Sequence, residues 1–127
     1  LAQCPCGADA PYAACCGRFL DGDQRPATAE ALMRSRYVAY VQRRADYLLR
    51  TWHPTTRPET LDFSTDHGQW LGLQVVRVVA GRADDEHGTV EFVARYKVNG
   101  RAHRLREISR FGREAGAWVY LNAEVTP

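Results

Sequence analysis

All four cysteines of this 127-residue chain lie within its first 16 positions. They form two close pairs separated by eight residues, and none occurs in the remainder of the chain. Four thiolates about 2.3 Å from a zinc ion complete a tetrahedral site, and short ligand pairs supply that geometry readily. A glycine directly after the second cysteine, Gly7, allows the backbone to fold back around the metal. The spacing therefore favours zinc ligation by Cys4, Cys6, Cys15 and Cys16.

A zinc site closed by four sulfurs has no open position for water or substrate, so we expect a structural role rather than a catalytic one. Such a site would fold a segment of about 20 residues that has no core of its own. Two disulfides are an alternative, although a bridge between the neighbours Cys15 and Cys16 would be strained. Free or redox-active thiols are the third. The spacing alone leaves these alternatives open.

Outside the cysteine segment, Arg36 and Glu107 stand out because each interrupts a predicted apolar face. An isolated buried charge costs several kcal/mol, so we expect these two side chains to form an ion pair inside the domain. Other polar and aromatic residues could line a cavity beside them. The candidate pocket comprises Arg36, Tyr37, Tyr40, Trp52, His53, Glu107 and Ser109. Their spacing enforces no catalytic dyad and no nucleophile motif is recognised, so catalytic residues are unassigned and an enzyme is the less favoured reading.

Two further groups combine histidine with carboxylates. One is His67 with Asp66, and the other is His87 with the acidic residues at 84–86. Both lie in polar sequence that reads as solvated loop, so a second metal site is a minor alternative.

The elements that position these residues can be predicted from periodicity. Apolar residues recur at about 100° per residue from Ala29 to Arg44, where Gly and Pro are absent, and Thr28 is a suitable N-cap. A shorter helix is predicted over residues 46–52, ending at His53 because the residue before a proline avoids the helical region. Residues 58–61 fit one more helical turn.

From about residue 70 the apolar period changes to two, which predicts strands. The expected strands cover residues 71–79, 89–98, 103–111 and 118–125. Asn99-Gly100 predicts a two-residue hairpin of type I′, and residues 112–116 are expected to turn the last hairpin. Helices followed by a four-stranded meander indicate an α+β domain with helices on one sheet face.

The charge is nearly balanced, with 17 basic and 15 acidic residues and a net charge of +2. The arginines are scattered rather than clustered, so we expect no nucleic acid as a partner. No apolar run reaches the roughly 20 residues that span a bilayer, and the first residues do not resemble a signal peptide. These features predict a cytoplasmic protein that does not bind membranes. A protein partner at the cysteine segment and a small-molecule ligand both stay open.

Two stretches of the sequence resemble known families. Cys-Pro-Cys-Gly, followed after eight residues by Cys-Cys-Gly, resembles the SEC-C motif of the SecA translocation ATPase and of many small bacterial proteins. The blocks AEALMRSRYVAYV, DYLLRTWHP, VEFVARYKVNG, REISRF and AWVYLNAE together resemble the YchJ family of small bacterial proteins. This second resemblance covers nearly the whole chain.

The resemblance implies a zinc knuckle with its linker at residues 1–26, followed at 27–127 by a cone-shaped domain. That domain would be of the nuclear-transport-factor-2-like (NTF2-like, cystatin-like) type, with a curved antiparallel sheet of about four strands wrapped by helices. The knuckle would be a structural or protein-interaction element. The alternative is a small-molecule binder or enzyme that uses the cone interior around Arg36 and Glu107. The loop at 7–14 keeps Tyr12 but lacks the lysines usual in SEC-C motifs, so the resemblance implies the metal ligands and not the partner.

Overall fold

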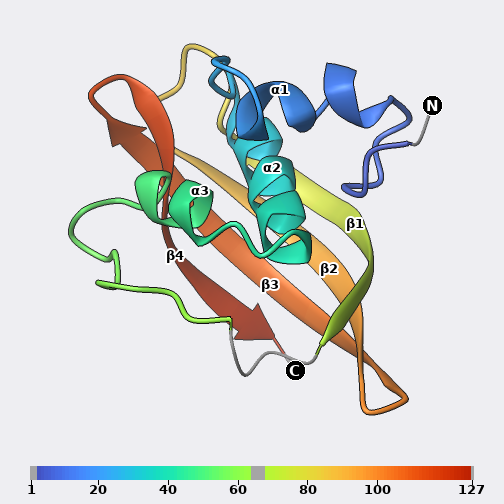
Figure 1. Ribbon diagram of the computed structural model, residues 1–127. Coiled ribbons are helices and arrows are strands. Elements are labelled where there is room, and N and C mark those ends of the chain that lie inside the picture. The colour runs from blue at the N-terminus through green and yellow to red at the C-terminus, as the bar shows by residue number, and fades with distance from the viewer. Residues whose placement is uncertain (1–2, 64–67, 127) are drawn as a thin grey trace.

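Helices come first in the chain and strands follow, which confirms the predicted α+β class (Figure 1). The computed structural model describes residues 3–63 and 68–126. The helical elements are η1 (Tyr12–Ala14), α1 (Gly17–Leu20), α2 (Ala29–Val41) and α3 (Ala45–Arg50). The strands are β1 (Gln69–Ala80), β2 (Gly88–Val98), β3 (Arg101–Glu114) and β4 (Ala117–Thr126).

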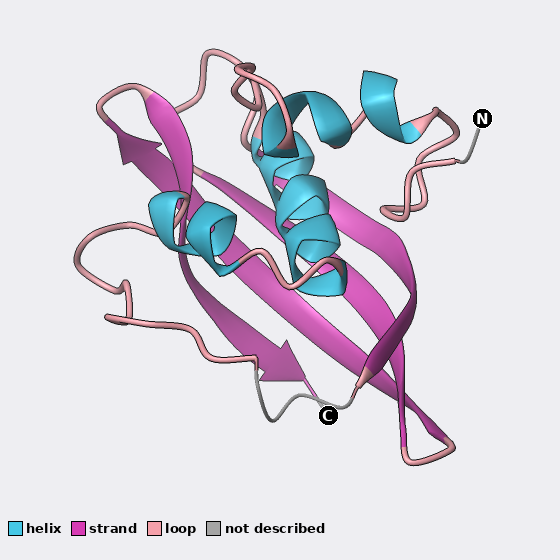
Figure 2. Ribbon diagram, viewed as in Figure 1, coloured by secondary structure: helices cyan, strands magenta, loops and turns pink. Residues whose placement is uncertain are grey.

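The four strands form one antiparallel sheet in the order β1-β2-β3-β4. Figure 2 shows α2 and α3 on one face of this sheet. The register sets Phe92 opposite Glu107 and Ala94 opposite Leu105, and directly opposed residues point to the same face. Arg104 alternates to the other face and is exposed. The predicted alternation along β3, with Glu107 directed toward the helices, is therefore confirmed.

The turn between β2 and β3 is the predicted one. Asn99 and Gly100 both have positive φ, 52° and 79°, as a type I′ turn requires. Most residues avoid this region, which is why Asn-Gly is favoured here.

The last hairpin differs from the prediction. β3 continues to Glu114, and the turn consists of Ala115 and Gly116, with φ of 52° and 84°. Arg113 pairs with Trp118 in the ladder, and its guanidinium carbon lies 4.1 Å from the indole ring centroid. This pairing keeps the two strands in register beyond residue 112, so a turn over residues 112–116 was too long a prediction.

α2 is the central helix and lies over the sheet (Figure 1). The Thr28 hydroxyl accepts a hydrogen bond from the Ala31 amide at 3.1 Å, which confirms the predicted N-cap. The helix ends at Val41 rather than Arg44, because Arg43 has φ of 55° and leaves the right-handed helical region. Val38, outside the predicted apolar stripe, is fully buried. α2 is thus enclosed on both sides, by the sheet and by the other helices.

α3 ends earlier than predicted because the next residues pair with β4. The Tyr120 amide donates to the Thr51 carbonyl, and the His53 amide donates to the Tyr120 carbonyl, each at 2.8 Å. Trp52 forms a parallel bridge with Tyr120. Residues 58–61 form no helical turn, so that prediction was wrong. Among the described residues, no helix combines the length and apolar content needed to cross a membrane.

One hydrophobic core joins the cysteine segment to the rest of the fold. Cys6 and Leu32 are fully buried in it, and Phe19 of α1 is 5% exposed. The indole of Trp118 in β4 donates to the Ala27 carbonyl at 3.0 Å, which ties the linker to the sheet. The N-terminal segment therefore packs as part of this core.

Candidate metal centre and interior cavity

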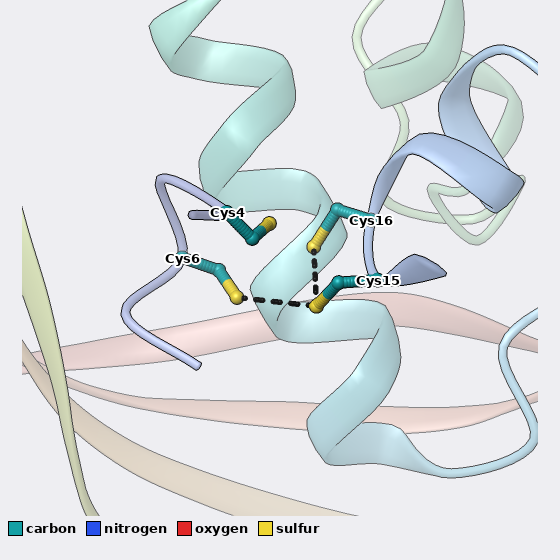
Figure 3. Close-up of side chains that lie close together, drawn as sticks. All are labelled: Cys4, Cys6, Cys15 and Cys16. Carbon is teal, nitrogen blue, oxygen red and sulfur yellow. Dashed lines mark hydrogen bonds between the residues drawn. The ribbon is translucent and has the colours of Figure 1, made fainter. Parts of the chain in front are cut away.

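The four cysteine side chains converge beside α2 (Figure 3). Cys4 and Cys6 lie in the loop before η1, and Cys15 and Cys16 lie between η1 and α1. All four Sγ atoms are within 4.8 Å of one another. Cys15 Sγ is 3.7 Å from Cys6 Sγ and 4.0 Å from Cys16 Sγ. All four thiols are free, so the disulfide alternative is not what the structure contains.

The loop backbone holds these sulfurs in place. The Cys4 amide donates to the Ala10 carbonyl at 2.9 Å, and the Cys15 amide donates to the Tyr12 carbonyl at 3.0 Å. Gly7 has φ of 90°, a conformation that glycine adopts without strain. A Cβ at this position would lie 2.9 Å from the Leu73 carbonyl of β1. The glycine therefore allows both the fold-back of the loop and its close approach to the sheet.

A basic side chain from α2 supports the cluster. Arg34 Nη1 donates to the Cys6 carbonyl at 2.8 Å and lies 3.9 Å from Cys6 Sγ. Arg34 Nε donates to Glu30 at 3.0 Å, one turn earlier on the helix. This guanidinium offsets negative charge on the sulfurs, as partners of metal ligands commonly do.

The pKa values of the clustered thiols are shifted in opposite directions. Hydrogen bonding to the Cys16 thiol lowers the pKa of Cys6 to about 4. Burial, together with the neighbouring Cys6 thiolate, raises the pKa of Cys15 to about 11. The same thiolate and burial raise the pKa of Cys16. One thiolate is therefore favoured at the expense of its neighbours, and a dication would relieve that competition.

The cluster fits a tetrahedral zinc ion. Four sulfurs about 2.3 Å from a common metal lie roughly 3.8 Å from one another. The separations of 3.7 and 4.0 Å match that edge length. These cysteines are the one His/Cys/Asp/Glu cluster of metal-binding type in the described part of the chain. His87 and its acidic neighbours form none, and Asp66 and His67 lie outside the described residues.

A cavity of about 280 Å³ lies on the sheet side of α2. Five of the seven predicted pocket residues line it, contributed by α2 and β3: Arg36, Tyr37, Tyr40, Glu107 and Ser109. Aromatic and apolar side chains complete the wall: Met33, Trp70, Phe92, Ala94, Leu105, Phe111 and Tyr120. The structure thus brings most of the predicted pocket together between the helix and the sheet.

Trp52 and His53 are the two predicted pocket residues that lie elsewhere. The Trp52 ring packs behind Arg36, and its buried Nε1 has no hydrogen-bond partner among the described residues. His53 Nε2 lies 3.5 Å from a Glu114 carboxylate oxygen, and its Nδ1 lies 2.7 Å from Thr55 Oγ1. Both residues pair with β4, which turns them away from the cavity.

Arg36 is 5% exposed and uses neutral partners. Its Nη1 donates to the Leu48 carbonyl at 2.8 Å and to Thr51 Oγ1 at 2.7 Å. The guanidinium carbon lies 4.9 Å from the Trp52 ring centroid and 4.6 Å from that of Tyr120. Burial lowers the pKa of Arg36 from its ordinary value.

Glu107 stands on the opposite wall. One of its carboxylate oxygens accepts a hydrogen bond from Ser109 Oγ at 2.9 Å. Burial raises the pKa of Glu107, and Arg36 offsets this effect in part. The two charged groups line one cavity and influence each other, but they form no ion pair within the described structure. The predicted ion pair is therefore not made by direct contact, because Leu48 and Thr51 accept the hydrogen bonds of Arg36 and Ser109 donates to Glu107.

Family membership follows from the sequence relatives. The sequence model of the family domain described as "YchJ, middle NTF2-like domain" matches residues 28–123. The chain belongs to the YchJ family. A UPF0225 protein of Chromobacterium violaceum is 56% identical, over 98% of this chain and 93% of that protein. A UPF0225 protein of Ralstonia nicotianae is 53% identical, over 98% of this chain and 92% of that protein.

Two solved structures share the fold of this YchJ-family chain. A SEC-C motif containing protein from Rhodopseudomonas palustris is 32% identical, with a TM-score of 0.85 over 98% of both chains. One from Psychrobacter arcticus is 28% identical, with a TM-score of 0.73 over 98% of this chain and 82% of its own. The predicted YchJ family, NTF2-like fold and N-terminal SEC-C-type cysteine segment are confirmed, and the cluster of this YchJ-family protein is a candidate metal site.

Sequence reasoning missed several residues of both sites. Arg34 was overlooked because it lies off the apolar stripe of α2, although it faces the cysteines. The sequence assigns no site to Tyr120 of β4 or Trp70 of β1. For Tyr120 the available signal is its position two residues after Trp118, since alternation puts both on one face of the strand. For Trp70 alternation gives no such signal, because a register shift between Trp70 and Gly72 interrupts it.

Proposed function

We propose that the four cysteines bind one zinc ion and that this zinc is structural. The observation that carries the proposal is the convergence of four free Sγ atoms within 4.8 Å of one another. The four sulfurs complete the coordination preferred by zinc, which leaves no position for substrate. When bound, the metal supplies a crosslink between the two halves of the N-terminal segment.

A structural role is supported over a protein-docking role by the burial of the apolar side chains of this segment. Phe19 and Leu20 are 5% and 6% exposed and pack in the protein's own core. The Tyr12 hydroxyl donates to the Asp21 carboxylate at 2.8 Å, and Arg44 of the segment after α2 binds the other oxygen of that carboxylate at 2.7 Å. The knuckle would thereby hold α2 and the linker against each other.

Metal analysis of protein purified under reducing conditions without chelator tests this proposal. We expect about one equivalent of zinc per chain, and loss of that zinc in Cys15→Ser. Ala14→Ser is the matched control, because Ala14 is exposed and adjacent. Less than half an equivalent of zinc in the unsubstituted protein, or full retention in Cys15→Ser, would contradict four-thiolate ligation.

We also propose that the interior cavity binds a small organic molecule. The observation in its favour is a buried cation, Arg36, in the wall of a mostly aromatic cavity of about 280 Å³. Ligand sites typically combine apolar walls with a few convergent polar groups. NMR titration of the labelled protein with small aromatic compounds tests this function, with shifts expected at Tyr37, Phe92 and Tyr120. The absence of saturable shifts at these residues would contradict it.

A further inference from the structure

Arg36 carries its charge into the protein interior without a carboxylate in contact. Its Nη1 donates two hydrogen bonds, both to neutral oxygens, and the neutral Tyr40 hydroxyl is a further side-chain hydrogen-bonding neighbour. A guanidinium has five N–H donors arranged as a fork that matches a carboxylate. The fork edge of Nε and Nη2 is not used by these bonds, and Arg36 lines the cavity.

The one carboxylate of the cavity wall makes no direct contact with this cation. Glu107 accepts a hydrogen bond from Ser109 on its own strand, and its charge and that of Arg36 attract each other across the cavity without forming an ion pair. Burying an unpaired charge is costly, and an anion that enters the site would recover part of that cost. The cavity therefore contains a buried cation whose missing counterion could be a ligand.

We propose that the cavity binds a compact organic monocarboxylate whose carboxylate pairs with Arg36. This inference rests on the ligand-binding function proposed above and names its ligand class. Arginine and carboxylate form charge-assisted hydrogen bonds that are stronger than neutral ones, and the fork geometry adds orientation. The Trp52 and Tyr120 rings, 4.9 and 4.6 Å from the guanidinium carbon, hold the cation in place.

The charged residues of the cavity wall favour a ligand with one negative charge over a ligand with two. Arg36 is the one cationic side chain among the described residues that line the cavity. A phosphate group carries close to two negative charges at neutral pH. Glu107, on the facing wall, would repel that second charge. A single carboxylate balances Arg36 without an excess of negative charge in a site of low polarity.

The apolar residues of the cavity wall favour a ligand whose remaining part, beyond the carboxylate, is small and apolar. Phe92, Leu105 and Phe111 of the sheet face Met33 and Tyr37 of α2 across the cavity. The volume of about 280 Å³ lies just below the usual range for small-molecule sites, which begins at about 300 Å³. A small apolar or aromatic acid fits these limits, whereas a nucleotide exceeds them.

Three probes of similar size test the proposal: benzoate, its neutral isostere benzamide, and phenyl phosphate. Their binding is followed by NMR titration of the full-length protein, with shifts mapped to the cavity residues. We expect benzoate to bind at least tenfold more tightly than either of the other two. Equal affinity for benzoate and benzamide would overturn the monocarboxylate inference while leaving small-molecule binding intact. If none of the three shifts cavity residues, both proposals fail.

Two substitutions locate the preference for the carboxylate. Arg36→Met removes the charge at similar side-chain length, and we expect the preference for benzoate over benzamide to disappear. Glu107→Gln removes the repulsion from the facing wall, so benzoate affinity should rise several-fold with benzamide unchanged. If Arg36→Met does not fold, the proposal is still tested by Glu107→Gln and by the comparison of the three probes on the unsubstituted protein. A benzoate preference unchanged by either substitution in folded protein would exclude the assignment to this cavity.

Discussion

At the scale of single residues, the two sites of this protein are distinguished by how their charges are balanced. Around the cysteines, Arg34 of α2 lies beside sulfurs that become anionic. In the cavity, Arg36 lies beside neutral oxygens and aromatic rings. Two arginines only two positions apart therefore lie on opposite sides of the same helix. The first has a carboxylate and a thiol in direct contact, whereas the second has a carboxylate only across the cavity.

Arg34→Gln tests the contribution of the first arginine. It removes the cation next to Cys6 Sγ while leaving all four ligands in place. Substitutions in the surroundings of metal ligands typically weaken binding by 10-fold or more, so we expect roughly tenfold weaker zinc affinity. Competition with a chromophoric chelator measures it. Arg25→Gln, in the exposed linker, should leave the affinity unchanged, and equal effects of the two substitutions would refute a specific role of Arg34.

Glu107→Gln tests the electrostatics of the cavity in the absence of ligand. Burial raises the pKa of Glu107 above its ordinary value of 4.5. The folded state thus binds this proton more tightly than the unfolded state. Its stabilising contribution is complete below that ordinary value and is lost as the pH rises through the raised pKa. We expect Glu107→Gln to match the unsubstituted protein at about pH 4 and to be more stable at about pH 7.

Urea unfolding at the two pH values measures the free energies of unfolding for this comparison. A Glu107→Gln protein that is less stable than the unsubstituted chain at neutral pH would show that Glu107 is stabilised there as an anion. A stability difference that does not vary with pH would show that its ionisation is not linked to folding.

At the scale of elements, α2 determines the geometry of both sites. It carries Arg34 toward the cysteines and Arg36, Tyr37 and Tyr40 toward the cavity. Its N-terminus is fixed by the Thr28 cap and by the Ala29 amide, which donates to the Gly81 carbonyl at 2.9 Å at the end of β1. The position of this one helix relative to the sheet therefore sets the width of the cavity.

Thr28→Ala tests the contribution of the cap. Loss of the hydrogen bond from the Ala31 amide should reduce the free energy of unfolding by about 1 kcal/mol. Thermal or urea denaturation measures the change. Thr28→Ser keeps the hydroxyl acceptor and should retain most of the stability. If alanine and serine were equally destabilising, the methyl group of Thr28 rather than its hydroxyl would be responsible.

At the scale of the whole molecule, the cysteine segment and the α+β domain share one core. Cys4, Cys6 and Cys16 are buried together with residues of α2, whereas Cys15 is half-buried. A bound metal would therefore stabilise more than the segment that ligates it. The sheet has its own extensive pairing along all four strands, so its central strands do not depend on the metal.

Removal of the metal tests this division. We expect chelation, or Cys15→Ser, to abolish hydrogen-exchange protection in residues 3–20 and to weaken it in α2, while β2 and β3 stay protected. The melting temperature should fall by roughly 10 °C, which corresponds to a loss of about 2 to 3 kcal/mol in a chain of this size. Global loss of protection would show that the cysteine segment is required for the whole fold. An unchanged protection profile would show that metal binding does not stabilise any part of it.

The sequence by itself determined which cysteines cluster, the order of the elements and five of the twelve residues that line the cavity. Cysteine spacing, helical periodicity and strand alternation are local properties, so the cluster of four cysteines and the positions of Arg36 and Glu107 in the domain interior were predicted. Only the tertiary structure decided what these groups contact. Arg36 bonds to α3 rather than to Glu107, Trp52 and His53 turn to β4, and Arg34 joins the cysteines. Partners of this kind depend on how α2, α3 and the sheet pack together, and side-chain spacing along the chain does not encode that packing.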